Sequence, residues 1–541
     1  MRCNCSQTRL NRIMRALLGQ SYYLRFDPKL WATMRPYPPL GTLYAASALR
    51  ERGHGVALFD AMLADSERAW SDALDRVRPD LAVLYEDSFN YLSKMCLLRM
   101  RQAALTMIDM AVARGCPVIV SGSDASDHPG LYLTRGARFV IAGEGDLTLA
   151  ELVDRLAGRT TTPFEAIAGL VFRDDDTGRV VRTPTRPLVD DLDALPYPAW
   201  DLVDIDAYRD RWRGRLSMNL VTTRGCPYHC NWCAKPIWGQ RYHSRSPENV
   251  VNELAWLVRD FRPDHLWFAD DILGLTPGWL ARFAELLAAR GLMVPFKCLS
   301  RADLLLRDGE AEALRRAGCR TVWMGAESGS QRVLDAMEKG VRVEQIVEAT
   351  RRLHDQGIEV GFFLQFGYPG ETRDDIARTF DLVRTCQPDD IGVSVSYPLP
   401  GTPFHQRVEA SIGSTRNWVD SDDLAMLYRG PFTTAFYRQL HRVLHREFRA
   451  RQTWRRLRGL APAMSTRPRV GVRQTLSLLR SVTTLPYARW RLDRLARVPN
   501  GDLGPLPYAL PLQSAARPTA QPAQELGPET AATRPMVAAG R

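Results

Sequence analysis

The sequence has no long apolar run and no secretion signal. Nowhere in its 541 residues do about 18 uncharged apolar residues follow one another, so we expect no transmembrane helix. The first residues carry Arg2, Arg9, Arg12 and Arg15. They lack the continuous apolar stretch and the small-residue cleavage site of a signal peptide. These absences predict a cytoplasmic protein.

Lysine is scarce, and arginine supplies nearly all of the positive charge. The only lysines are Lys29, Lys94, Lys235, Lys297 and Lys339. The net charge is nevertheless +11 and the sequence pI is about 9.3, with much of the excess after Tyr437. Such a charge is typical of a solvated basic surface, and it also suits nucleic acid, a membrane surface or an anionic ligand. The basic stretch lacks the interleaved aromatic residues on which the bases of single-stranded nucleic acid stack, so we expect no nucleic-acid partner.

The basic C-terminal stretch also contains apolar residues. Between Arg455 and Arg497 these include Leu476, Leu478, Leu479, Leu485 and Trp490. Two interpretations stay open. The stretch either makes a peripheral contact with a membrane, or it forms an amphipathic helix that packs on the preceding domain.

Residues 14–158 alternate short apolar strands with amphipathic helices. We expect strands at 16–24, 56–59, 81–84, 117–120 and 139–141, and helices at 40–52, 66–77, 94–114 and 146–156. This alternation predicts an α/β domain with a doubly wound, Rossmann-like parallel sheet. Ligands of such sheets bind beyond the carboxyl ends of the strands.

The rest of the chain divides into four further segments. Residues 159–212 are rich in Pro, Asp and Thr and predict a linker with a small β element, a hairpin over 169–182. In 213–405 we expect strands at 218–223, 265–269, 296–299, 321–325, 359–366 and 391–397. Six strands with intervening helices predict a partial (β/α)6 TIM-type barrel with its chemistry at the strand carboxyl ends. Residues 406–498 predict a basic helical region, and 499–541 a disordered tail.

Three of the ten cysteines fall within eight residues. Cys226, Cys230 and Cys233 have the spacing C-x₃-C-x₂-C directly after an expected strand. In a long chain without a secretion signal, clustered cysteines indicate metal ligands rather than disulfides. Three thiolates can hold three irons of a cubane and leave the fourth iron open to a small molecule. The alternatives are a zinc site with His229 as the fourth ligand, or three unrelated cysteines. Cys116, Cys298 and Cys319 are expected to be small core residues.

The cysteine motif resembles the CxxxCxxC motif of the radical S-adenosylmethionine (SAM) superfamily. In that family the cysteines hold a [4Fe–4S] cluster, and the open iron chelates the amino and carboxylate groups of SAM. An electron from the cluster cleaves SAM to methionine and a 5′-deoxyadenosyl radical, which abstracts hydrogen from the substrate. The cofactor supplies this chemistry, and the barrel supplies orientation and excludes water.

Further matches to the superfamily extend over about 213–404. The resemblance assigns Trp232, Asp270, Asp271, Ser300, Arg301, Glu327 and Ser328 to SAM binding. Asp270 and Asp271 suit the SAM ammonium group, and the planar fork of Arg301 suits its carboxylate. Alternatives are a helix cap by Asp271, a surface ion pair of Arg301, and a structural salt bridge between Glu327 and Lys339.

The first domain resembles the cobalamin-binding domains that are fused to some radical SAM enzymes. The resemblance assigns Gly41, Ser88, Gly122, Ser123, Asp124, Gly143 and Glu144 to cobalamin binding. Small residues there let the backbone approach a corrin closely. The DxHxxG motif of many corrinoid proteins is absent, and His128 has the wrong spacing to replace its histidine. The domain either binds cobalamin without a lower histidine ligand or binds no corrinoid.

The overall layout resembles cobalamin-dependent C-methyltransferases and the anaerobic Mg-protoporphyrin monomethyl ester oxidative cyclase. Methylation of an unactivated carbon is the leading hypothesis, with an oxidative, cyclase-type reaction as the second. A non-catalytic corrinoid or redox sensor is the alternative from another class. The resemblance implies a small-molecule substrate and a low-potential electron donor such as flavodoxin or ferredoxin.

Overall fold

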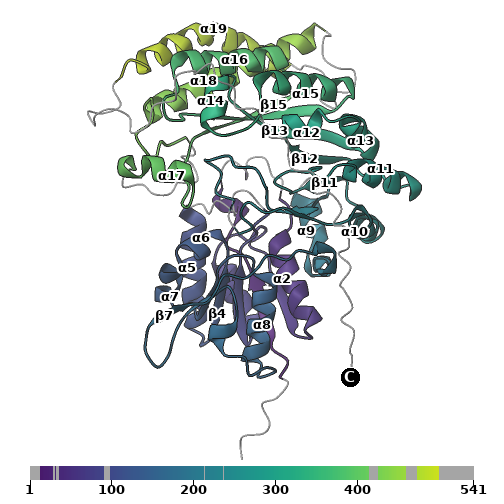
Figure 1. The fold of residues 1–541 in the computed structure, drawn as a ribbon, viewed down its shortest axis with the longest axis vertical. Coiled ribbons are helices and arrows are strands. Elements are labelled where there is room, and N and C mark those ends of the chain that lie inside the picture. The colour runs from purple at the N-terminus through teal and green to yellow at the C-terminus, as the bar shows by residue number, and fades with distance from the viewer. Residues whose placement is uncertain are drawn as a thin grey trace, which may run out of the picture. The chain divides into compact units, whose positions relative to one another are not determined.

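Figure 1 shows the fold, which a computed structural model provides. The structure describes residues 12–27, 31, 36–89, 98–211, 214–235, 237–412, 424–458 and 472–498. The tail expected at 499–541 lies outside the described residues. None of the helices in the described ranges is long and apolar enough to cross a membrane.

The N-terminal part contains a seven-stranded sheet in the order β2-β1-β3-β4-β5-β6-β7. Its strands are β1 (Arg15–Gly19), β2 (Gly55–Phe59), β3 (Leu81–Tyr85), β4 (Val118–Ser121), β5 (Phe139–Ile141), β6 (Leu170–Arg173) and β7 (Val180–Arg182). The first five are parallel, which confirms the doubly wound sheet. The expected hairpin forms as β6 and β7, and β6 pairs antiparallel with β5. The stretch that we assigned to a linker therefore extends this sheet.

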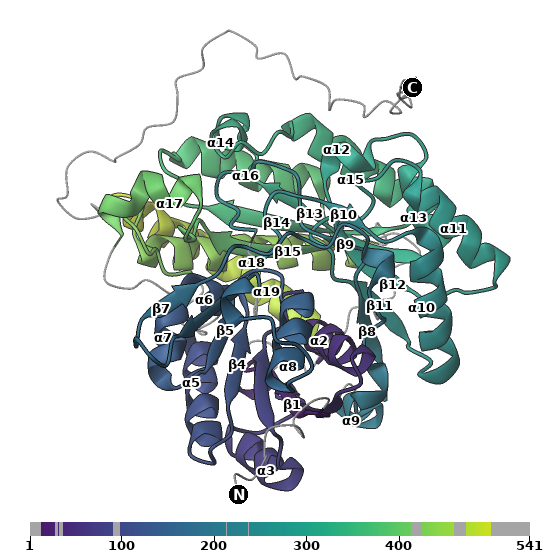
Figure 2. The same ribbon diagram turned by 60° about the horizontal axis from the view of Figure 1, so that its bottom comes forward.

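Helices cover both faces of the first sheet. Its central strands are apolar at consecutive positions, as in sheets buried on both sides. One face packs on α3 (Arg68–Val77) and α5 (Leu98–Val112), and the other on α2 (Leu40–Glu51) and α8 (Asp146–Leu156). Figure 2 shows α5 and α8 on opposite sides of β4. This arrangement leaves the loops at the strand carboxyl ends as the place for a ligand.

The second sheet has six parallel strands in the order β15-β14-β13-β12-β11-β8. They are β8 (Ser217–Leu220), β11 (His265–Phe268), β12 (Phe296–Ser300), β13 (Cys319–Glu327), β14 (Glu359–Phe366) and β15 (Asp390–Val395). All six expected strands form. The order is linear, with β8 and β15 at its two ends, as in a partial barrel.

Helices between these strands are α10 (Pro247–Asp260), α11 (Trp279–Ala289), α13 (Glu310–Ala317), α15 (Val343–Asp355) and α16 (Arg373–Cys386). Local sequence sets where they start. Ser246 caps α10 by accepting the Asn249 N–H, with Pro247 at the first position, and Thr372 and Asp375 form a capping box on α16.

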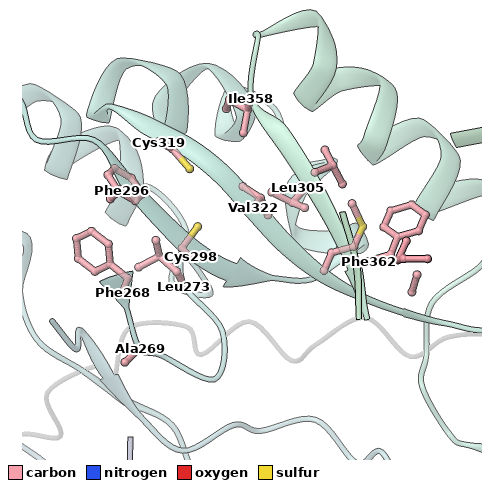
Figure 3. Packing of buried hydrophobic residues seen from close by; sticks show 14 of the residues in the cluster. Phe268, Ala269, Leu273, Phe296, Cys298, Leu305, Cys319, Val322, Ile358 and Phe362 are labelled. Atoms are coloured by element: carbon pink, nitrogen blue, oxygen red, sulfur yellow. The ribbon is translucent and has the colours of Figure 1, made fainter. Parts of the chain in front are cut away.

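Figure 3 shows alternate strand residues, among them Phe268, Phe296 and Val322, packed in the core with Cys298 and Cys319. Both cysteines are buried, as expected.

The C-terminal region is helical, as expected. It contains α17 (Pro403–Val408), α18 (Thr434–Leu457) and α19 (Val472–Leu495). Helix α18 packs on α16 and β15, and α19 packs along α18 (Figure 1). The C-terminal helices therefore add an outer layer to the barrel beside its β15 edge.

Candidate functional site

The three cysteines lie on one loop at the carboxyl end of β8. The short strand β9 (Thr223–Arg224) pairs antiparallel with β10 (His243–Ser244) and ties the two ends of this loop together. Gly225 has φ +83°, and a Cβ there would lie 2.1 Å from the Arg241 carbonyl oxygen, so only glycine fits. We call residues 225–242 the cysteine loop.

Two of the thiols point inward. Cys226 and Cys230 are buried and Cys233 is half-buried, whereas His229 is exposed. An exposed His229 speaks against the zinc alternative, in which it would join the thiols. In the described part of the chain, no three His, Cys, Asp or Glu side chains converge as ligands of a single ion. A cubane does not need that convergence, because each cysteine binds a different iron.

Asp270 fixes the backbone that leads into the cysteine loop. Its Oδ1 accepts the N–H groups of Thr222 and Thr223 at 2.8 and 2.6 Å, and both threonine hydroxyls donate to it as well. Burial raises the pKa of Asp270 to about 6. Oδ2 is buried and has no partner among the described residues. Asp270 therefore holds the loop with one oxygen and leaves the other for a ligand.

Two cations lie beside Cys230. Arg301 Nη1 is 3.9 Å from the Cys230 Sγ, and the guanidinium stacks on Tyr228. Arg301 also donates to Asp303 and to the carbonyl of Lys339. The ion pair of the alternative does form, between Arg301 and Asp303 at 3.0 Å, but Arg301 is buried in it rather than at the surface.

Lys339 and Glu327 form the expected salt bridge at 2.9 Å. Burial alone would lower the pKa of Lys339, but the Glu327 carboxylate and the nearby Cys230 outweigh it and the pKa rises. Glu327 has φ +54° and follows an irregularity at the end of β13. A Cβ at Gly325 would meet both charged side chains within 2.6 Å, so the glycine makes room for the pair.

The other expected SAM residues lie at the same edge of the barrel. Ser300 and Arg301 end β12, and Asp271 follows β11. Ser328 is fully buried inside its own turn, where its hydroxyl accepts the Ser330 N–H at 3.1 Å. Ser328 thus shapes the turn after β13. No helix starts at Asp271, since α11 begins only at Trp279, so the helix-cap alternative is wrong.

The second group of expected residues meets the cysteine loop in a narrow pocket. Its lining combines loops at the carboxyl ends of the first sheet with the cysteine loop: Gly41, Tyr85, Ser88, Phe89, Ser121, Gly143, Glu144, Gly145, Asp146, Arg224, Ile237 and Trp238. Four of the seven residues expected to bind cobalamin are in this lining, namely Gly41, Ser88, Gly143 and Glu144. Sequence reasoning missed the contribution of Arg224, Ile237 and Trp238.

Gly122, Ser123 and Asp124 do not line this pocket. Gly122 has φ +155° and lies against Glu86. Asp124 accepts from Arg101 Nε at 2.8 Å and from the Tyr132 hydroxyl at 2.6 Å. Its carboxylate therefore ties neighbouring helices together. His128 is half-exposed beside Asp124, with 4.0 Å between its Nε2 and the Asp124 Oδ1.

Two further polar groups at this edge have no partner among the described residues. Gln20 and Ser21 directly follow β1 and are each 1% exposed, and the Gln20 Nε2 and Ser21 Oγ atoms make no hydrogen bond. Buried polar atoms nearly always have a hydrogen-bond partner. Two such atoms without one, at the carboxyl end of a strand, therefore indicate a ligand. The strand predicted at 16–24 included both residues, so the sequence did not indicate that they lie in the loop after β1.

Arg224 connects the two groups of residues. Its Nη1 lies 2.5 Å from Glu144 Oε1 and 2.6 Å from Asp146 Oδ2, and all three side chains are buried. Burial would lower the pKa of Arg224, but the two carboxylates raise it well above its usual range. Since Arg224 immediately precedes Gly225 and Cys226, the ion pairs join the first sheet's loops to the start of the cysteine loop.

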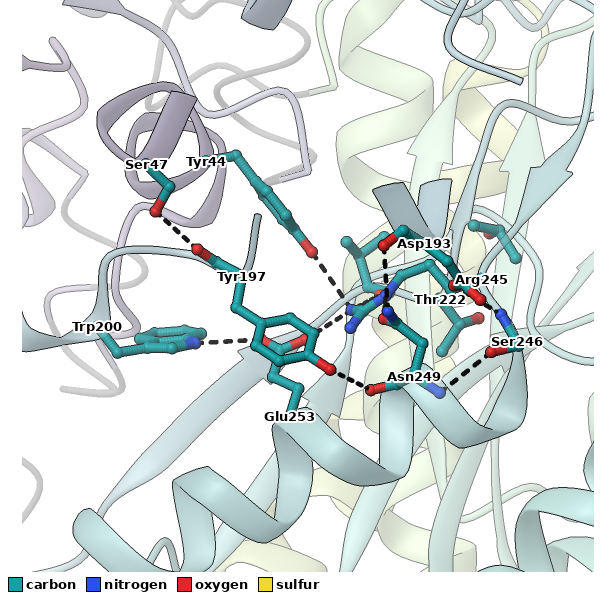
Figure 4. Close-up of polar contacts among 12 residues, drawn as sticks. Tyr44, Ser47, Asp193, Tyr197, Trp200, Thr222, Arg245, Ser246, Asn249 and Glu253 are labelled. Atoms are coloured by element: carbon teal, nitrogen blue, oxygen red, sulfur yellow. Dashed lines mark hydrogen bonds and ion pairs between the residues drawn. The ribbon is translucent and has the colours of Figure 1, made fainter. Parts of the chain in front are cut away.

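A second polar network supports the same junction (Figure 4). Arg245 pairs with the fully buried Glu253 at 2.6 Å and donates to the carbonyl of Val221 at 2.9 Å. Its Nη1 also lies 3.3 Å from the Tyr44 hydroxyl on α2, and Trp200 donates its indole N–H to Glu253. The network links α2, the segment after β7 and the barrel just ahead of the cysteine loop.

Replacing Arg224 tests the importance of this junction. We expect Arg224→Met to lower the free energy of unfolding by roughly 3–5 kcal/mol, because it leaves two buried carboxylates unpaired. Chemical denaturation measures the change. Arg282→Met is the matched control, since it breaks an exposed ion pair with Glu248 and should cost at most about 1 kcal/mol.

Adding Glu144→Gln and Asp146→Asn to Arg224→Met should recover part of the lost stability, because the buried charges are then gone. Equal stability of Arg224→Met and the wild type would contradict this account of the junction.

Comparison with known proteins places this geometry in a family. Residues 220–383 match the radical SAM superfamily. Over 70% of its length the chain is 29% identical to an uncharacterized methyltransferase of Pyrococcus horikoshii, of which it covers 81%. Over 59% of its length it is 27% identical to the anaerobic magnesium-protoporphyrin IX monomethyl ester cyclase of a Synechocystis strain, and it spans 63% of that cyclase.

Among solved structures the fold matches OxsB, a cobalamin-dependent SAM radical enzyme with aqua-cobalamin and SAM bound. The match covers 89% of this chain and 72% of OxsB, with a TM-score of 0.67 at 18% sequence identity. The superfamily match and the methyltransferase and cyclase relatives indicate an enzyme rather than the non-catalytic sensor. The chain is therefore a radical SAM enzyme, which works with a [4Fe–4S] cluster and SAM, and it has the fold of a cobalamin-dependent member of the superfamily.

Proposed function

We propose that this enzyme uses cobalamin and SAM to methylate an unactivated carbon of a small-molecule substrate. The observation that carries the proposal is the junction at Arg224. It brings the ligand-binding edge of a Rossmann-like sheet against the cysteine loop of the barrel. Radical formation and methyl transfer to one substrate need both cofactors at one place. The cluster supplies the electron that cleaves SAM, and the corrinoid serves as methyl carrier.

Cys226, Cys230 and Cys233 are the proposed cluster ligands. Arg301 lies against Cys230. The Cys230 thiol, together with Glu327, also raises the pKa of Lys339. These cations offset the negative charge that three thiolates would bring into a buried site. We propose a low-potential donor such as flavodoxin or ferredoxin as the source of electrons, and a cytoplasmic location, where thiols stay reduced.

The barrel edge supplies the proposed SAM contacts. Asp270 Oδ2 is buried and has no partner within the described ranges, so it can accept hydrogen bonds from the SAM ammonium group. Glu327 and Arg301 lie at the ends of neighbouring strands and, held by Lys339 and Asp303, frame the proposed SAM site. Asp271 and Ser300 lie at the carboxyl ends of β11 and β12, and Lys339 Nζ lies 5.9 Å from the centroid of the Trp232 ring, next to Cys233 in the chain.

The first sheet supplies the proposed cobalamin contacts. The space around the Gly143 Cα is open, so its backbone is accessible to a large ring. Ser88, Gln20 and Ser21 add polar groups at the same edge, and the latter two carry unpaired atoms. His128 lies beside Asp124, away from the pocket lining, so the proposed binding has no lower histidine ligand.

The second candidate is an oxidative reaction without methyl transfer. The similarity to the magnesium-protoporphyrin cyclase favours it. Both reactions use the same cofactors, so the products decide between them. Methylation adds one CH₂ to the substrate, and oxidation gives an oxygenated or ring-closed product.

Product analysis tests the proposed function. We would reconstitute the protein without oxygen, add SAM, hydroxocobalamin and a strong reductant, and measure 5′-deoxyadenosine and S-adenosylhomocysteine together. Methylation predicts both products. Cys230→Ala should abolish both, whereas Cys386→Ala, which removes a buried thiol of α16, should abolish neither.

The outcomes separate the candidates. 5′-Deoxyadenosine without S-adenosylhomocysteine would favour the oxidative reaction. If preparations with a full cluster form neither product across a panel of candidate substrates, the proposed function is wrong.

Helix α19 packs on α18, as one of the two interpretations expected, and we also propose that its outer face contacts an anionic membrane surface. Leu479, Val482, Tyr487 and Trp490 are exposed, and all but Tyr487 fall on one narrow stripe of the helix. Tyr487 stacks on Trp490 beside that stripe. Arg480, Arg491 and Arg494 flank the apolar side chains, and Ala488 and Leu492 face inward. An apolar face with flanking arginines and a tryptophan is typical of helices that lie in a membrane interface. The chain's apolar and cationic residues thus favour lipid over a purely charged partner.

Vesicle sedimentation tests this contact. We expect the full chain to bind vesicles with anionic lipid and to bind neutral vesicles less, because arginines add attraction to an anionic surface. Val482→Glu with Trp490→Glu should weaken binding about tenfold or more. Met293→Glu, which changes an exposed apolar residue of the barrel, is the control and should change nothing. Equal binding by the double variant and the wild type would refute the contact.

A further inference from the structure

The few lysines of this chain concentrate in the barrel. Lys235, Lys297 and Lys339 are the lysines that the structure describes, and all three lie between β9 and the start of α15. In a chain whose surface cations are arginines, lysine at these positions indicates a need for a compact ammonium group. Lysine presents a point charge with three donors on a flexible stem, and arginine a wide planar fork.

Lys235 lies in the cysteine loop two residues after Cys233. Its side chain is 6% exposed and its Nζ has no hydrogen-bond partner in the described part of the chain. Its backbone has φ +44°, a left-handed conformation that costs a non-glycine residue free energy. Burial of an unpaired ammonium group is also expensive. Such a conformation and such a burial are expected where an anion binds.

The surroundings of Lys235 place that anion beside the cysteines. Lys235 shares the cysteine loop with all three cysteines and is only two residues from Cys233, so its buried side chain starts beside the proposed cluster ligands. On the other side, Ile237 and Trp238 follow Lys235 and line the pocket toward the first sheet. The ammonium group thus lies between the cysteines and the pocket.

The other cations near the cysteines are already engaged. Lys339 pairs with Glu327. Arg301, the residue first expected to meet the SAM carboxylate, uses four N–H groups on Asp303, the Lys339 carbonyl and Cys230. Of the cations described beside Cys226 and Cys230, Lys235 is the one whose charged group has no partner.

We propose that Lys235 binds the carboxylate of the SAM molecule at the cysteine loop and thereby sets the affinity and orientation of SAM. A carboxylate only accepts hydrogen bonds, and a buried ammonium can give it up to three in a short charge-assisted contact. The inference rests on the proposed cluster site, because SAM must lie beside the cysteines for Lys235 to reach it.

SAM titrations of the cluster-loaded protein test the role of Lys235. The electron paramagnetic resonance spectrum of the reduced cluster reports binding, with SAM and decarboxylated SAM as the two ligands. We expect Lys235→Met to weaken SAM binding roughly 10- to 100-fold, as for the loss of a charge-assisted hydrogen bond, and to leave decarboxylated SAM nearly unaffected. Lys297→Met is the matched control and should bind both ligands like the wild type.

Measuring the iron and sulfide content checks that each variant carries a full cluster. If Lys235→Met does not load, Lys235→Gln keeps the length and polarity of the side chain and should show a smaller loss for SAM alone. Equal losses for both ligands, or no loss for either, would overturn the proposal. So would an unchanged SAM affinity with a shifted midpoint potential, which would assign the charge to the cluster. A wild type that binds no SAM despite a full cluster would instead refute the proposed function.

Discussion

The double ion pair of Arg224 is the constraint on which the arrangement of the candidate site depends. One guanidinium pairs with two buried carboxylates, Glu144 in the loop after β5 and Asp146 at the start of α8, and the next residues along the chain are Gly225 and Cys226. Glu144 also accepts the Val189 N–H at 2.7 Å, so the same carboxylate holds the segment after β7. A shift of the first sheet's loops therefore moves the start of the cysteine loop. Because breaking a buried pair leaves an uncompensated charge, the junction resists such a shift.

The charges around the cysteines divide into a fixed set and an available set. Asp270 Oδ1, Arg301, Lys339 and Glu327 are satisfied by neighbouring groups and hold the loop, the β12 end and the β13 turn in place. Asp270 Oδ2 and the Lys235 ammonium are buried and have no hydrogen-bond partner among the residues that the structure describes, and they carry opposite charges. A zwitterion with an ammonium and a carboxylate group matches this pair. The satisfied groups provide the preorganised frame, and the unsatisfied ones are where binding energy can be gained.

Much of the fold could be predicted from the sequence, because both sheets are parallel and their strands are short apolar runs between amphipathic helices. All six barrel strands and the hairpin over 169–182 form as expected. The hairpin's place at the edge of the first sheet was not predictable, since pairing with β5 is a long-range contact that local composition does not encode. The cysteine motif could be recognised from the sequence because its three cysteines lie within one short loop.

The charged contacts between sheets could not be predicted. Arg224 is a single arginine before a glycine, and its partners lie some 80 residues earlier. The residue type of Asp124 and its place after a strand suggested a ligand contact. In the structure its carboxylate instead accepts hydrogen bonds from Arg101 and Tyr132. Lys235 was counted only as one of five lysines, because its burial and lack of a partner exist only in the fold. Pairing at these positions depends on distances that arise after both sheets have formed.

Mössbauer spectroscopy of the protein reconstituted with ⁵⁷Fe, before and after addition of SAM, tests the central claim most directly. The account predicts a four-iron cluster in which SAM changes the signal of one iron and leaves the other three nearly unchanged, since three are held by Cys226, Cys230 and Cys233. A cluster whose four irons respond alike, or a preparation that retains zinc in place of iron, would contradict the account.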